Sequence, residues 1–330
     1  MKNSNILEVK NLKIIYKTDD SVVEALNGAN LSIAEGQTLG LVGETGAGKS
    51  TLAKGIMGLI PNPPGKILSG EIYYRGQDLL KMHEKDRRKI RGAEISMIFQ
   101  EPMTSLNPVM TVGKQIEEVL RAHGKVSNNE ARKEAENMLQ IVGIPKDRFD
   151  EYPHQFSGGM KQRIIIAIAL ACNPKLLIAD EPTTALDVTI QHQVLTLMNN
   201  LKSKFNTSML MITHDLGIVA QNCDYVAIMY AGEIVEYGTL HDIFKSFKHP
   251  YTKGLFGSIP SLTEDVQRLT PIEGQVSDPT RLPKGCKFHP RCKYVKEACL
   301  EWDSEMFNVD SEHQVRCLMY NPESTLISEG

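Results

Sequence analysis

The sequence predicts an α/β fold with an antiparallel β edge, an inserted helical subdomain and a loop-rich C-terminal extension. Three patterns indicate this class. Over residues 37–60 an apolar strand pattern runs into a glycine-rich turn and then a helical pattern. Residues 101–153 have mainly helical spacing, and strand patterns separated by a helical one return over residues 176–215. Strands that alternate with helices are typical of a parallel sheet covered by helices.

The composition is that of a folded chain without a membrane span. The 330 residues are 41% hydrophobic, enough for a large core, and a net charge of −3 gives no basic field for nucleic acid. The longest apolar stretch, Ile164 to Cys172, is far shorter than the roughly 20 residues that cross a bilayer. The N-terminal residues lack the pattern of a secretory signal, so we expect a reducing cytoplasm and no disulfides.

The first predicted elements are strands. Ile6 to Tyr16 and Val23 to Ile33 alternate apolar and polar side chains, which is typical of strands with one buried face, and we expect an antiparallel edge. The strand, loop and helix of residues 37–60 follow, and the proline-rich turn Pro61 to Gly65 is expected to stop that helix. The segments EIYYRGQDLL and EISMIFQ are predicted to be further strands.

These elements predict a division of the chain into four parts. Residues 1–100 and 171–248 form the two parts of an α/β core, and residues 101–170 form the helical subdomain between them. Residues 249–330 form the extension, where Pro, Gly and Cys become frequent and helical periodicity fades.

The strongest local pattern is Gly43-Glu44-Thr45-Gly46-Ala47-Gly48-Lys49-Ser50-Thr51, which matches the phosphate loop of P-loop NTPases between a strand and a helix. Its glycines allow a tight turn in which backbone N–H groups and the helix N-terminus face phosphate oxygens. Lys49 is expected to reach the β and γ phosphates, and Ser50 to bind Mg²⁺. The alternative is a glycine-rich turn with a chance Lys-Ser.

A second pattern is the apolar strand Leu176 to Asp180, followed directly by Glu181. Two carboxylates at the end of a buried strand are costly unless a cation lies there. Asp180 suits Mg²⁺, directly or through water, and Glu181 suits a general base for the attacking water. A solvated strand end is the alternative, and a phosphate loop in the same chain disfavours it.

A third pattern is the turn Ser157-Gly158-Gly159 before the helical run IIIAIALAC, where the hydroxyl and amides can bind a phosphate at a helix N-terminus. Placed between Gln100 and the acidic strand, this turn resembles the signature of the ATP-binding cassette (ABC) family. The resemblance implies a P-loop ATPase that binds ATP and Mg²⁺. Phe156 and Met160 replace the family's usual Leu and Gln, so an apolar anchor is kept and an amide is lost.

The remaining landmarks follow the order of that family. The resemblance implies that Gln100 senses Mg²⁺ and water, that Asp187 lies in the loop that crosses to a partner subunit, and that His214 contacts the γ phosphate. Tyr16 matches the family's adenine-stacking aromatic residue. Simpler roles stay open: surface polar residues for Gln100 and Asp187, a hydrogen-bonded strand end for His214. Packing within a strand fits Tyr16 equally well.

In the resembled family two cassettes pair head to tail, because the phosphate loop and the signature turn do not meet within one subunit. ATP contacts both subunits and closes the dimer, and hydrolysis releases it. The segment after Gln100 passes this motion to a membrane protein, which couples ATP turnover to solute movement. We therefore expect two integral-membrane permease subunits and a second ABC ATPase subunit, related or identical, as partners, and no nucleic acid.

The tail narrows the resemblance. Residues His249 to Pro260 and Pro271 to Cys292 resemble the C-terminal extension of oligopeptide and dipeptide importer ATPase subunits. This implies uptake of short peptides, or of another solute such as nickel, at the cytoplasmic face of a bacterial or archaeal membrane, with an extracytoplasmic peptide-binding protein as an indirect partner. The alternatives are a soluble ABC-type ATPase acting on a ribosome or DNA, and a binding module without turnover. Glu181 argues against the module, which needs no general base.

The extension contains four cysteines in a polar segment: Cys286, Cys292, Cys299 and Cys317. Buried cysteines need apolar neighbours, so a ligand set is the better interpretation. The spacing matches neither zinc pairs nor ferredoxins and leaves the metal open. The dipeptide-importer branch implies a 4Fe-4S cluster held by these four residues, with an ordering role. The alternatives are zinc, with His289 or His313 replacing a thiolate, and a metal-free or disulfide state.

Overall fold

The computed structural model describes residues 4–100, 105–123, 126–184, 186–258, 272–302 and 305–322. The chain groups into two compact units that alternate along the sequence. The first unit is Met1–Leu7, Ile33–Thr38 and Tyr73–Thr213, and the second is Glu8–Ser32, Leu39–Ile72 and His214–Gly330. The predicted division into four functional parts stays a prediction, because the two units are defined by contacts between residues and not by what each part does.

In the first unit three short parallel strands lie side by side in the order β6 (Ile95–Ile98), β7 (Leu176–Asp180) and β8 (Ser208–Ile212). Every residue of these strands is buried, which explains their continuous apolar runs, since parallel sheets are covered on both faces. Because the strands are parallel, their carboxyl ends meet at one edge. That edge leads into the segments that carry the predicted acidic residues.

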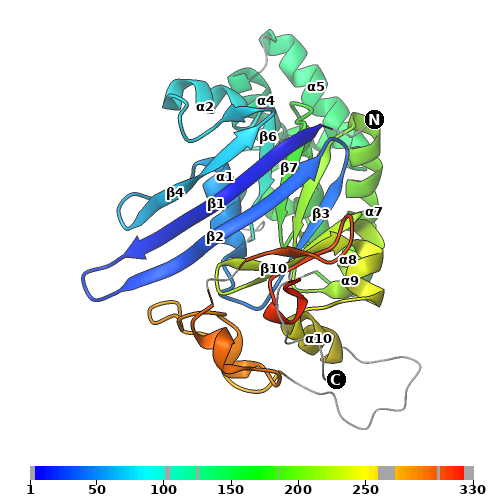
Figure 1. The fold of residues 1–330 in the computed structure, drawn as a ribbon. Coiled ribbons are helices and arrows are strands. Elements are labelled where there is room, and N and C mark those ends of the chain that lie inside the picture. The colour runs from blue at the N-terminus through cyan, green and yellow to red at the C-terminus, as the bar shows by residue number, and fades with distance from the viewer. Residues whose placement is uncertain are drawn as a thin grey trace. The chain divides into compact units, whose positions relative to one another are not determined.

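Helices make up most of the rest of this unit (Figure 1): α4 (Val112–His123), α5 (Asn128–Ile141), α6 (Gly158–Leu170) and α7 (Val188–Phe205). α4 and α5 pack against each other and are amphipathic, with one apolar face buried. α6 is apolar nearly all round and packs against β6, α4, α5 and α7. The short helix α2 (Glu84–Ile90) buries no residue.

The second unit contains β3 (Thr38–Val42), β9 (Tyr225–Tyr230), β10 (Glu233–Thr239), β12 (Gln314–Val315) and β11 (Phe307–Asn308), of which β9 lies between β3 and β10. β3 and β9 are parallel, and β9 and β10 form an antiparallel hairpin. The hairpin turn is Ala231-Gly232, and both residues have positive φ, as tight two-residue hairpin turns require. The helix α1 (Lys49–Met57) follows β3 and the glycine-rich loop.

The same unit holds most of a second sheet, in which β2 (Val22–Ala34), β1 (Asn5–Lys17) and β4 (Gly65–Tyr74) are neighbours. In Figure 1 β1 and β2 are the long blue strands. The two predicted N-terminal strands are thus confirmed, each a residue or so longer at its ends. Their alternating burial pattern is the one expected of strands with one face on the core.

Three local predictions differ from the structure. The helix α1 ends at Met57, before the proline-rich turn, because Gly58 adopts the left-handed conformation that closes a helix. The segment EIYYRGQDLL is not one strand: β4 ends at Tyr74 and a turn leads to the two-residue β5 (Gln77–Asp78). Arg75 and Gly76 both have positive φ there, which makes a tight hairpin.

The third difference lies in the extension, which was expected to be loop-rich from its first residue. After α8 (Leu216–Asn222) and α9 (Leu240–Lys245), the helix α10 (Pro250–Gly257) occupies its start. The remainder, where the structure describes it, has only short turns, η3 (His289–Arg291), η4 (Glu297–Leu300) and η5 (Leu318–Tyr320), and the strands β11 and β12. No helix among the described residues is both long and apolar enough to cross a membrane.

Candidate nucleotide site

The phosphate-loop sequence forms a tight loop between β3 and α1 in the second unit. Lys49 is only 8% exposed, and its ammonium donates hydrogen bonds to the backbone carbonyls of Gly43, at 2.7 Å, and Glu44, at 3.1 Å. The Ala47 N–H donates to the Glu44 carbonyl at 3.1 Å and closes the turn. The loop therefore has a defined shape in which a cation lies at its centre.

Two of its glycines are required by close backbone approaches. A Cβ on Gly43 would lie 2.2 Å from the carbonyl oxygen of Met229 on β9. Gly48 has φ +105°, and a Cβ there would lie 2.6 Å from the carbonyl oxygen of Ala25 on β2. Neither backbone atom can move aside as a flexible side chain would, so a side chain at either position would displace the loop.

The other loop residues form the accessible part of this site. Thr45 and Gly46 are exposed, and Ser50 and Thr51 are half-buried at the start of α1. An accessible loop at a helix N-terminus is a favourable place for phosphate, because the first N–H groups of the helix have no partner within it. The geometry fits the predicted roles of Lys49 and Ser50, which stay predictions.

In the first unit the structure brings Gln100 and Glu181 together at the carboxyl edge of its strands. Glu181 directly follows β7 with φ +48°, and its N–H donates to the Ile212 carbonyl on β8 at 2.9 Å. The Glu181 carboxylate accepts hydrogen bonds from the Thr184 hydroxyl, at 3.0 Å, and from the Gln100 amide, at 3.5 Å. These contacts hold Glu181 in a left-handed conformation that non-glycine residues rarely adopt. Asp180, the last residue of β7, is 2% exposed.

The Ser-Gly-Gly turn and Asp187 each cap a helix, and the starts of these two helices approach each other. Ser157 is exposed and caps α6, its hydroxyl accepting from the Met160 N–H at 3.4 Å. Asp187 caps α7 and accepts from the Ile190 N–H at 3.0 Å. A Cβ on Gly159 would lie 2.6 Å from the Ile190 side chain, so glycine allows the start of α6 to approach the start of α7.

Arg148 supports this turn and was not singled out from the sequence. Its guanidinium lies 4.2 Å from the centre of the Phe156 ring and 3.6 Å from the Met160 sulfur. It also donates to the Gln155 carbonyl at 3.1 Å. A guanidinium stacks well on an aromatic face. Phe156 and Met160 therefore pack against the guanidinium of Arg148. No sequence signal marked this contact, which joins Arg148 to the start of α6.

Tyr16 and His214 belong to the second unit. Tyr16 is half-buried near the end of β1, and a Cβ on Gly65, at the start of β4, would lie 3.0 Å from its ring. This position is that of a side chain packing between strands, and adenine stacking stays a prediction for it. His214 is exposed and precedes Asp215, the residue that caps α8.

The predicted residues are thus divided between the units. The first unit holds the Gln100–Glu181 pair with Asp180, and the Ser157 turn with Asp187. The second unit holds the phosphate loop, Tyr16 and His214.

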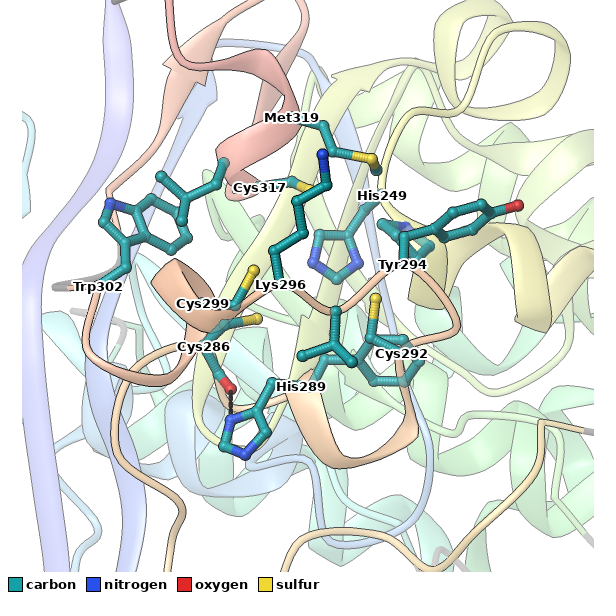
Figure 2. A pocket seen from close by; sticks show the side chains of 14 residues that line it. His249, Cys286, His289, Cys292, Tyr294, Lys296, Cys299, Trp302, Cys317 and Met319 are labelled. Carbon is teal, nitrogen blue, oxygen red and sulfur yellow. Dashed lines mark hydrogen bonds between the residues drawn. The ribbon is translucent and has the colours of Figure 1, made fainter. Parts of the chain in front are cut away.

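The four cysteines of the extension line one pocket in the second unit (Figure 2), together with His249, Phe288, His289 and Trp302 among others. All six cysteines of the chain are free thiols. Burial raises the pKa of the Cys286 thiol to about 11 and that of the Cys317 thiol to about 12.

Among the described residues, no group of three or more His, Cys, Asp or Glu side chains is arranged to hold a metal ion. His289 lines the pocket, and its Nδ1 lies 2.9 Å from the Cys286 carbonyl oxygen. His313 is fully buried and its Nε2 lies 2.8 Å from a Glu236 carboxylate oxygen. His313 does not line the cysteine pocket, which makes it the weaker of the two candidates for a zinc ligand.

Comparison with known proteins defines the class first. A family model described as ABC transporter matches residues 26–184. A solved dimeric ATP-binding cassette bound to ADP and Pi has a TM-score of 0.63 and 30% identity, over 71% of this chain and 98% of that one. CbiO1 of Clostridium perfringens, part of an ABC transporter complex, has a TM-score of 0.64 and 30% identity, over 74% of this chain and 92% of that one. The fold is that of an ABC ATPase, as predicted.

Curated relatives narrow the class. The model described as oligopeptide/dipeptide transporter, C-terminal region, matches residues 235–299. The oligopeptide transport ATP-binding protein OppD of Bacillus subtilis is 51% identical over 97% of this chain and 90% of its own length. The dipeptide transport ATP-binding protein DppD of the same organism is 49% identical over 94% of both chains. The chain belongs to the oligopeptide/dipeptide family of ABC transporter ATPases.

Proposed function

We propose that this ATPase powers the uptake of di- and oligopeptides across the cytoplasmic membrane. The observation that carries the hydrolytic part is the placement of Glu181, whose carboxylate is oriented by the Thr184 hydroxyl and the Gln100 amide at the end of β7. A carboxylate held by donors at an accessible strand edge is suited to orient a water molecule and accept its proton. The family membership supports peptides as the solute.

The loop geometry supports the proposed role of Lys49 in phosphate binding. Lys49 donates to loop carbonyls and lies where an ammonium can turn to phosphate oxygens. Ser50 at the start of α1 and Asp180 at the end of β7 are the proposed Mg²⁺ ligands, with Gln100 as the proposed sensor. Bound Mg²⁺ would neutralise phosphate charge. Tyr16 is the proposed adenine contact, and His214 the proposed γ-phosphate contact.

A head-to-tail pair of cassettes is the proposed working form. Ser157 is exposed at the start of α6, so a triphosphate held by a facing phosphate loop has access to its hydroxyl and to the amides of Gly158 and Gly159. Asp187 caps α7, whose first turn approaches the start of α6, and is proposed to reach the same partner. The second cassette is a related or an identical chain. Two permease subunits, and indirectly an extracytoplasmic peptide-binding protein, complete the proposed transporter at the cytoplasmic face of a bacterial or archaeal membrane.

The cysteine pocket is the proposed site of a 4Fe-4S cluster. All four thiols line one cavity with largely apolar surroundings, and thiolates are the usual ligands of such clusters. Zinc bound by the same thiols stays the alternative. When bound, the cluster would supply ordering energy to a segment with little core of its own.

Deletion of the gene in its host tests the transport role. Uptake of labelled di- and oligopeptides should be lost and nickel uptake kept. A wild-type copy should restore peptide uptake, and a Glu181→Gln copy should not. Loss of nickel uptake alone would support the metal importer instead. Recovery of the protein with ribosomes or DNA, and not with membranes, would support the soluble ATPase.

A further inference from the structure

The phosphate loop is joined to the C-terminal extension by a bidentate ion pair within the second unit. Arg291 donates from Nη1 to Glu44 Oε2 at 2.7 Å and from Nη2 to Glu44 Oε1 at 3.1 Å. The Arg291 side chain is only 4% exposed, and that of Glu44 is 27% exposed. A planar guanidinium on a carboxylate fixes direction as well as distance, and burial protects the pair from screening by salt.

All three nitrogens of the Arg291 guanidinium donate hydrogen bonds. Its Nε donates to the Glu273 carbonyl at 3.2 Å, and Nη2 also reaches the Ile272 carbonyl at 3.4 Å. Its guanidinium carbon lies 5.8 Å from the centre of the Tyr230 ring and 5.9 Å from that of Phe288. These partners hold the guanidinium from several sides, so it can serve as a rigid support for Glu44.

A second contact reaches the same loop residue through its backbone. The Glu44 N–H donates to the Tyr251 hydroxyl at 2.9 Å. Tyr251 is fully buried, its ring packs 4.7 Å from that of Tyr230, and its own N–H donates to Nδ1 of His249 at 3.0 Å. The Glu44 amide is therefore committed to the extension and does not face phosphate.

We propose that Arg291 is a positioning residue for the phosphate loop and that, through Glu44, the C-terminal extension sets the affinity for nucleotide. The inference rests on the proposed role of the loop in phosphate binding. A loop that is already ordered loses less conformational freedom when a ligand binds. Contacts that order the phosphate loop therefore raise its affinity for nucleotide. Arg291 directly precedes Cys292, so the segment that lines the cysteine pocket also carries the contact to the loop.

The test compares nucleotide binding by Arg291→Met, which keeps an apolar stem and removes the guanidinium, with the wild type. The Kd for ATP and for ADP should rise roughly fivefold or more. The KM for ATP should rise with it while kcat is largely kept. Arg291→Lys should fall between the two, because an ammonium keeps the charge and loses the fork. Lys293→Met is the matched control, since Lys293 is exposed and pairs with Glu273, and its Kd should equal that of the wild type.

A double-mutant cycle separates positioning from a merely structural role. In a Glu44→Gln background, Arg291→Met should add little to the Kd, because its effect passes through Glu44. A wild-type Kd in Arg291→Met, or an undiminished effect in the Glu44→Gln background, would overturn the inference. If Arg291→Met does not fold, Arg291→Lys and Glu44→Gln decide in the same way. A wild-type protein that binds no ATP would instead refute the proposed function.

Discussion

At the scale of single residues, the phosphate loop and the acidic strand edge are stabilised in different ways. The phosphate loop depends on backbone packing, since a Cβ on Gly43 would meet the Met229 carbonyl. The acidic edge depends on side-chain hydrogen bonds, since Thr184 and Gln100 both donate to Glu181. Substitutions at the two places should therefore fail differently, one in folding of the loop and the other in turnover.

Replacing Glu181 with Gln should leave ATP binding intact and lower hydrolysis by a factor of about 10² or more, because an amide cannot accept a proton from water. Phosphate release and equilibrium ATP binding, measured on the same preparation, give the two quantities. The matched control is Glu136→Gln, a carboxylate of the same unit on α5 that pairs with Arg132, for which we expect the wild-type rate. Turnover by Glu181→Gln at the wild-type rate would remove Glu181 from the role of general base.

Replacing Gly43 with Ala should destabilise the protein by about 1–3 kcal/mol and weaken ATP binding, because the added Cβ meets a backbone oxygen that cannot rotate away. Gly46→Ala is the comparison: nothing lies within 4 Å of its Cβ, and only its φ of +84° opposes alanine. Denaturant unfolding should rank Gly43→Ala below Gly46→Ala in stability. The reverse order would show that conformation outweighs the close approach.

At the scale of elements, caps decide where helices begin. α5 starts at a capping box in which Ser127 accepts from the Glu130 N–H and the Glu130 carboxylate accepts from the Ser127 N–H at 2.8 Å. The cap lies at the start of the helix that packs on α4, so it contributes to the stability of the helical part of the first unit.

Ser127→Ala should therefore lower the free energy of unfolding by about 1 kcal/mol, because the N–H groups of the first turn lose their acceptor. Chemical denaturation followed by circular dichroism measures the change. Ser203→Ala, an exposed serine inside α7, is the control and should be neutral or slightly stabilising, since alanine is the better helix former. Equal losses in the two variants would contradict a capping role.

The prediction of helices and strands succeeded where a periodic apolar pattern continues over many residues. It failed where a single turn determines the local structure. The strands β1 and β2 and the helices α4, α5 and α7 follow from repeated apolar spacing over ten or more residues. The hairpin at Arg75-Gly76 was missed because Arg75, not a usual turn residue, is left-handed there. α10 was missed because a His cap and Pro at the first turn begin a helix only eight residues long.

At the scale of the whole molecule, the cysteine pocket joins parts of the extension that are apart in sequence. Cys286, Cys292 and Cys299 lie near the short turns η3 and η4, whereas Cys317 directly precedes η5. A metal group bound by all four would tie these segments together, and its loss would free them. The stability of the extension should therefore depend on whether the metal group is bound.

Anaerobically purified protein should contain iron and acid-labile sulfide in equal amounts, and Cys317→Ser should lose both and unfold at a lower temperature. Cys172→Ser is the control, since Cys172 belongs to the first unit and does not line the pocket, and it should keep the iron. Zinc without sulfide in the wild type would support the zinc alternative. Full iron content in Cys317→Ser would exclude Cys317 as a ligand.

The sequence by itself determined the class of the protein, and it predicted the phosphate loop, the acidic strand end and the signature turn, because each of these three patterns depends on residue types within about ten positions of one another. Only the tertiary structure decided what supports them. Arg291 and Glu44 are 247 positions apart, and Arg148 reaches Met160 from another segment. Such contacts depend on where folding places two side chains that are far apart in sequence and not related by a helical or strand period. Only the three-dimensional geometry distinguishes an arginine that supports a loop from one that is solvated.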